Sequence, residues 1–103
     1  MSETTLTEKI RAALRISSTA EKITEEINDC IAACERDLQD AGIKNIDEED
    51  ALIVRAVTVY CKTEFGYNNK AEQFQKSYDS IKLHLSLSSD YTTVSETDTG
   101  GGA

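Results

Sequence analysis

Hydrophobic residues recur every three or four positions along most of this chain, the spacing of amphipathic helices. The first such segment covers residues 6–14, and its apolar face consists of Leu6, Ile10, Ala13 and Leu14. Thr5 and Glu8 have the spacing of a capping box, in which two side chains bond the backbone N–H groups at a helix start. The pattern predicts a short first helix that needs packing against other elements.

The clearest amphipathic pattern covers residues 20–41. Its apolar face consists of Ile23, Ile27, Ile31, Cys34, Leu38 and Ala41, and acidic residues fill many of the other positions. Ser18, three residues before Glu21, is placed to cap the start of this segment. Gly42 is placed to adopt the left-handed backbone conformation that often ends a helix. We therefore expect a surface helix with one buried face.

Residues 51–65 are apolar on nearly every side and predict a central, buried helix. Asp47 is the expected N-cap, and the acidic residues after it suit the positive end of the helix dipole. The β-branched residues here would also suit a strand, but the length of the segment, its cap and its helical neighbours favour a helix. Gly66 ends the segment, and residues 67–69 form a turn.

A fourth helix is predicted after this turn, with Asn69 and Glu72 as another capping box. Its buried face consists of Ala71, Phe74, Tyr78, Ile81 and Leu85, while the alternation of Leu83, Leu85 and Leu87 leaves its end open. We therefore expect an all-α fold, a compact bundle of about four helices within residues 1–87.

Residues 88–103 form a polar segment that ends in three glycines and an alanine. Such a segment cannot bury enough apolar surface to fold alone, so we expect a flexible polar tail. It is either an inert end or an arm that becomes ordered on a partner, and inert ends are commoner.

Composition narrows the functions that this chain can have. The net charge of -8 repels phosphate backbones and argues against sequence-specific DNA binding. No apolar run approaches the ~20 residues that span a bilayer, and residues 1–5 lack the basic and apolar regions of a signal peptide. We expect no membrane association and a location in the cytosol of the cell that makes the protein.

Residues that carry chemistry are few. Cys30 and Cys34 share one helix face, as metal ligands can, but they and Cys61 lie on apolar faces where cysteine packs as a small hydrophobic residue. The single histidine, His84, has no nucleophile placed beside it by a local motif. No phosphate-binding loop or metalloprotease motif is present. We predict no catalytic residue, no cofactor and no metal, and a protein that is not an enzyme.

Five residues are candidates for contact with a protein partner: Tyr67, Lys70, Lys76, Lys82 and Tyr91. Tyr67 falls in the predicted turn, and Tyr91 falls near the end of the ordered region. The three lysines place positive charge on the fourth helix, where they could meet acidic residues of an adjacent subunit's second helix. Exposed pairs of this kind contribute little individually and mainly set register.

Three stretches, residues 9–16, 26–43 and 52–91, resemble the head-to-tail connector proteins of tailed bacteriophages and prophages. These are also described as adaptor, head completion or DNA-packaging proteins. The last stretch is the most specific, with characteristic runs at residues 56–62, 65–67, 74–79 and 85–88. Asp50 and Ala51 depart from the Asp-Pro pair typical of the family, although either pair can start a helix.

The resemblance implies a structural protein of the virion, located at the head–tail interface and assembled in the bacterial host cytoplasm. Its subunits are expected to form a ring, a dodecamer, beneath the portal protein. The ring would extend the DNA channel and dock the stopper or tail-completion protein, and DNA would pass through the lumen without sequence-specific binding. The residues alone leave open a cytosolic helical adaptor or regulatory subunit that binds a single protein partner, and more remotely an enzyme of a new helical family.

Overall fold

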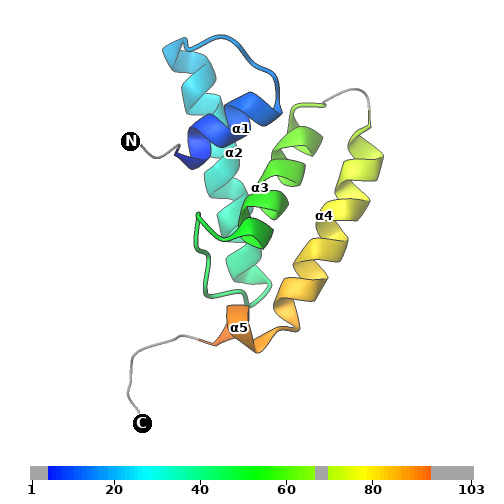
Figure 1. The fold of residues 1–103 in the computed structure, drawn as a ribbon. Coiled ribbons are helices and arrows are strands. Elements are labelled where there is room, and N and C mark those ends of the chain that lie inside the picture. Colours follow the sequence, from blue (N-terminus) through cyan, green and yellow to red (C-terminus); the bar gives the residue numbers. More distant parts are fainter. Residues whose placement is uncertain (1–4, 67–69, 94–103) are drawn as a thin grey trace.

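The computed structural model describes residues 5–66 and 70–93, and these contain five helices and no strand (Figure 1). They are α1 (Leu6–Ala13), α2 (Glu21–Asp40), α3 (Ala51–Glu64), α4 (Ala71–Ser86) and the short α5 (Ser89–Thr92). The prediction of an all-α bundle with four main helices is therefore confirmed.

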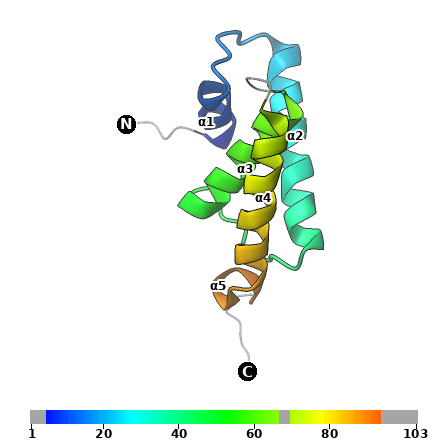
Figure 2. The same cartoon turned by 90° about the vertical axis from the view of Figure 1, so that its right-hand side faces the viewer.

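Helix α3 is the centre of the bundle, because it contacts α1, α2 and α4. Figure 2 shows α1 and α3 on one side of α2, and Figure 1 shows α4 running alongside α3. Side chains from all four helices form one core, and the largest fully buried ones include Ile10, Ile27, Leu38, Ile43, Ile53, Val57, Tyr78 and Leu85. The predicted buried faces of α1 and α2 are confirmed.

The expectation that α3 is buried on nearly every side is only partly right. Ile53, Ala56 and Val57 are fully buried, but Ala51 and Arg55 are exposed. Helices α1 and α4 cover the flanks of α3, and no described element lies over the strip between them. One strip of α3 therefore remains open on the surface.

Two glycines end helices as predicted. Gly42 follows α2 with φ +95° and Gly66 follows α3 with φ +64°, both in the left-handed region. After α2, the backbone N–H of Gly42 donates to the carbonyl of Gln39 (2.9 Å), and that of Ile43 donates to the carbonyl of Leu38 (3.0 Å). These bonds satisfy carbonyl groups that the helix end would otherwise leave unpaired.

The helix starts differ from prediction at two places. Asp50, not Asp47, caps α3: its carboxylate accepts hydrogen bonds from the N–H groups of Leu52 (2.8 Å) and Ile53 (3.3 Å). The Asp47 carboxylate accepts from Glu49 N (2.9 Å) within the preceding turn. Ser18 does not cap α2, because its hydroxyl accepts from Ala20 N (3.2 Å), one residue before the helix begins. The predicted cap at Asn69 lies outside the described residues.

Residues 88–93, which the sequence assigned to the polar tail, pack against the bundle in the structure. Ser88 caps α5, and the Tyr91 carbonyl accepts hydrogen bonds from Lys44 N (2.6 Å) and Asn45 N (2.9 Å) in the α2–α3 connection. The Asn45 side chain donates to the carbonyls of Asp90 (2.7 Å) and Thr93 (2.8 Å). Tertiary hydrogen bonds thus order a polar segment that has little apolar surface to bury. Residues 94–103 lie outside the described residues.

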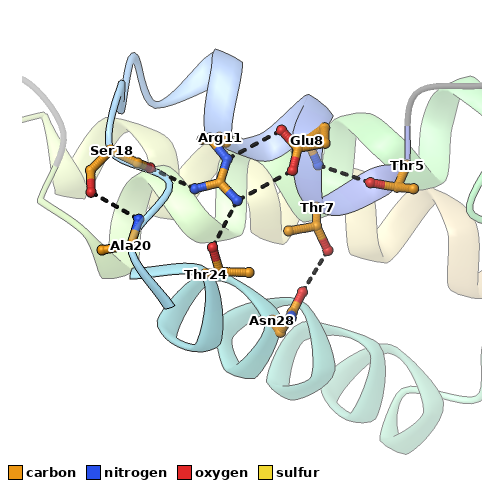
Figure 3. Close-up of polar contacts among 8 residues, drawn as sticks. All are labelled: Thr5, Thr7, Glu8, Arg11, Ser18, Ala20, Thr24 and Asn28. Atoms are coloured by element: carbon orange, nitrogen blue, oxygen red, sulfur yellow. Dashed lines mark hydrogen bonds and ion pairs between the residues drawn. The ribbon is translucent and has the colours of Figure 1, made fainter. Parts of the chain in front are cut away.

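A buried arginine fixes the position of α1 (Figure 3). Arg11 is 7% exposed. Its guanidinium group donates hydrogen bonds to the Ser18 carbonyl (2.7 Å) and the Thr24 hydroxyl (2.9 Å). It also pairs with the Glu8 carboxylate at 3.2 Å, while the Glu8 N–H donates to the Thr5 hydroxyl at the start of α1. Arg11 therefore connects α1, the α1–α2 connection and the first turns of α2.

Candidate protein-interaction surfaces

The open strip of α3 forms the floor of a groove between α1 and α4, with a volume of about 670 Å³. Leu52, Val54 and Val59 of α3 supply apolar floor, and Phe74 of α4 lines one wall. We call this hollow the α3 groove. Its mixed apolar and polar lining is typical of surfaces that bind a protein segment.

The α3 groove carries positive charge in an acidic protein. Lys9, Arg55 and Lys62 line it, against one acidic residue, Glu49. The Lys62 Nζ atom lies 5.5 Å from the centre of the Phe74 ring, within the range of a cation–π contact. The groove therefore favours a partner that combines apolar and acidic side chains.

A second feature lies on the outer face of α4. Leu83 and Leu87 are 60% and 78% exposed, and they are the large hydrophobic residues left exposed in the described part of the chain. They are one helical turn apart, while Leu85 between them is fully buried. The sequence did not determine where the fourth helix ends, and the structure shows that α4 continues to Ser86 with Leu83 on its outer face. We call Leu83 and Leu87 the α4 ridge.

Lys82 was predicted to contact a partner, but in the structure it pairs within its own chain. Its Nζ atom donates to Asp37 Oδ2 of α2 at 2.9 Å, and the Tyr78 hydroxyl donates to the same oxygen at 2.6 Å. Burial alone would raise the pKa of Asp37, but these two hydrogen bonds and the Lys82 charge outweigh it and lower that pKa. The Asp37–Tyr78–Lys82 cluster therefore fastens α4 to α2.

Tyr91, another candidate, also has partners within the chain. Its hydroxyl donates to the Asp50 carboxylate, with oxygen–oxygen distances of 3.1 and 3.0 Å. Lys70 and Lys76 are exposed and belong to the start and outer surface of α4. Tyr67 lies outside the described residues. Sequence reasoning thus missed the α3 groove and the buried role of Arg11.

Cys30, Cys34 and Cys61 are buried and form no disulfide bonds, as their apolar positions predicted. Burial raises the pKa of Cys34 to about 12, so this thiol stays protonated at neutral pH. Within residues 5–66 and 70–93, no group of three or more His, Cys, Asp or Glu side chains is arranged to hold a metal ion. His84 is exposed in the last turn of α4.

A pair of carboxyl groups makes stability depend on pH. The Oε2 atom of Glu35 is buried with no hydrogen-bond partner among the described residues. Burial, followed by the neighbouring Glu48 carboxyl group, raises the pKa of Glu35 to about 7 from its usual 4.5. Between these two pH values the folded protein holds a proton that the unfolded chain releases, so the free energy of unfolding falls as pH rises.

Glu35→Gln is expected to remove this dependence and to raise the free energy of unfolding at pH 8 by about 1–2 kcal/mol, a value reduced by solvent screening. Urea denaturation at pH 5 and pH 8 measures both effects. Glu25→Gln, on the exposed face of α2, serves as the control and should keep the pH dependence of the natural protein. An unchanged pH dependence in Glu35→Gln would contradict this account.

These features define a small helical protein whose surface is suited to contacts with other proteins. No helix among the described residues is long and apolar enough to cross a bilayer. Residues 6–92 match the family described as phage connector protein, and the chain belongs to this family. It is therefore a structural connector of a phage and a component of the virion that interacts with portal or tail proteins. No curated protein and no solved structure matches the chain.

Proposed function

We propose that this chain forms a ring, a dodecamer, beneath the portal protein at the head–tail interface of the virion. The ring extends the DNA channel and docks the stopper or tail-completion protein. The observation that carries this proposal is the presence of two different surfaces, the α3 groove and the α4 ridge, on one connector chain. A closed ring of identical subunits requires two such surfaces that meet head to tail.

The charge of the chain supports a passive role toward DNA. With a net charge of -8, a ring of these subunits presents mostly acidic side chains and makes few tight phosphate contacts. DNA then passes through the lumen without sequence-specific binding. The protein needs no catalytic residue, cofactor or metal for this function, and it assembles in the bacterial host cytoplasm before it becomes part of the virion.

Two of the candidate residues are exposed lysines of α4. Lys70 and Lys76 are exposed on α4, and we propose that they face acidic side chains of a neighbouring subunit. Such exposed pairs contribute little energy and mainly fix the register of the contact. Lys82 already pairs with Asp37 of its own chain, so its charge is partly compensated before any partner binds.

Electron microscopy of the protein mixed with the portal protein of the same phage tests the proposal. A ring attached to one end of the portal is the expected result. Absence of portal binding under any condition would overturn the proposal and favour a helical adaptor or regulatory subunit with a single partner.

The free subunit is expected to be largely monomeric at low salt and to form its ring mainly when the portal supplies a template. Identical subunits of charge -8 repel one another, and salt weakens this repulsion, with a Debye length of about 10 Å at 0.1 M. The portal offsets the remaining cost by holding neighbouring subunits at high effective concentration. Sedimentation across a salt series, with and without portal, measures this. A stable ring at low salt without portal would contradict the mechanism.

A further inference from the structure

We propose that the α4 ridge of one subunit docks into the α3 groove of the next. This inference rests on the proposed ring and identifies the two surfaces that build it. The groove has an apolar floor, and the ridge supplies the two large hydrophobic side chains most exposed in the described part of the chain. Burial of Leu83 and Leu87 in a neighbour's groove removes both from water.

The acidic side chains beside the ridge are complementary to the basic side chains of the groove. Asp79 lies one turn before Leu83, and Asp90 follows Leu87 on α5; both are exposed. Across the contact, the groove offers Lys9 and Arg55, while Lys62 lies over the Phe74 ring in its wall. Acidic side chains beside an apolar ridge are the chemistry that a basic, apolar groove accepts. This local attraction selects one orientation between subunits that otherwise repel each other.

The two surfaces point in different directions, so one chain cannot fill its own groove. Leu83 follows Phe74 by nine residues, which at about 100° per residue turns it half a revolution away from the groove wall. Each ridge that enters a groove leaves a free groove on one subunit and a free ridge on the other. The contact is therefore heterologous and repeats from subunit to subunit until a ring closes.

Cysteine cross-linking tests the contact directly, because the natural cysteines are buried. Thr58→Cys places a thiol in the groove, and Leu87→Cys places one on the ridge. The two variants are mixed at high protein concentration and high salt, which screens the repulsion, and then oxidised with copper phenanthroline. We expect disulfide-linked dimers in at least about tenfold excess over either variant alone, reflecting a specific contact against random collision.

Control mixtures of cysteine variants distinguish a specific ridge–groove contact from chance collision and from pairing of two ridges. Thr58→Cys mixed with Glu21→Cys, an exposed position at the start of α2, measures chance collision. Leu87→Cys dimers formed without the groove variant would mean that ridges pair with each other, which overturns the proposal. No excess over the control mixture also overturns it. Arg55→Cys, at an exposed position of the same groove, repeats the test in case Thr58→Cys fails to fold.

A charge exchange supplies a second test that involves no cysteine. Arg55→Asp is expected to weaken portal-templated ring assembly at least about tenfold, and mixing it with Asp79→Arg subunits should restore part of the loss. Lys22→Asp changes the net charge equally on an exposed part of α2 and serves as the control. Equal losses in Arg55→Asp and Lys22→Asp would overturn the proposal. If the natural protein forms rings on the portal but the cysteine variants give no specific cross-link, the ridge–groove contact is wrong and the proposed ring still stands.

Discussion

Val57→Asp is expected to lower the free energy of unfolding by more than about 4 kcal/mol, enough to unfold much of the protein at room temperature. Val57 is fully buried in α3, the helix that contacts α1, α2 and α4. An unpaired carboxylate there has no water and no cation to stabilise its charge. Thermal melts followed by circular dichroism measure the loss.

Glu26→Gln is the control for this substitution. Glu26 is exposed on α2, so its loss should change the free energy of unfolding by no more than about 0.5 kcal/mol. Similar melting temperatures for Val57→Asp and Glu26→Gln would mean that the core does not lie where the structure places it.

Arg11→Ala is expected to lower the free energy of unfolding by about 2–4 kcal/mol. The substitution removes the donors that satisfy the Ser18 carbonyl and the Thr24 hydroxyl, together with the ion pair to Glu8. Helix α1 has eight residues and depends on such contacts, because short helices are marginal in water. Urea denaturation gives the free energy, and hydrogen exchange shows whether α1 opens first.

Arg36→Ala provides a matched comparison within the same chain. Arg36 also pairs with a carboxylate, that of Asp40 at 3.3 Å, but the two side chains are 76% and 66% exposed. Exposed pairs contribute little, so this variant should lose less than about 0.5 kcal/mol. Equal losses in the two arginine variants would show that burial does not determine the effect of Arg11.

The helical spacing of apolar residues predicted the core well, because any helix with an apolar face has to bury that face. Residues spaced by three or four positions share a helix face, and a face that carries Ile27, Ile31 and Leu38 must be covered. Gly42 and Gly66 were equally predictable, since few other residues tolerate the left-handed backbone after a helix. The conformation at these positions depends only on residues that are close by in the sequence.

The remaining features depend on partners far away in the sequence. Asp47 and Asp50 are both suitable caps, and the hydrogen bond from Tyr91, 41 residues after Asp50, forms only in the folded chain. Arg11 looks like a surface residue in sequence because charge usually favours water. Lys82 looked available for the same reason, although Asp37 lies 45 residues earlier in the chain.

The α3 groove could not be predicted for a related reason. An apolar helix such as α3 is expected to be surrounded, and the sequence does not reveal that its neighbours cover only its flanks. The family resemblance named a class of partner without indicating a surface. Only the packing of α1 and α4 beside α3 identifies the strip where such a partner can bind.

The hydrogen bonds between α5 and the α2–α3 connection have a consequence for the order in which the chain folds. Synthesis proceeds from the N-terminus, so α1, α2 and α3 leave the ribosome before Tyr91 is available. Until then, the backbone N–H groups of Lys44 and Asn45 lack their native acceptor, and Asp50 caps α3 without the Tyr91 hydroxyl. The connection that leads into α3 therefore reaches its native hydrogen bonding late, when α5 packs against it.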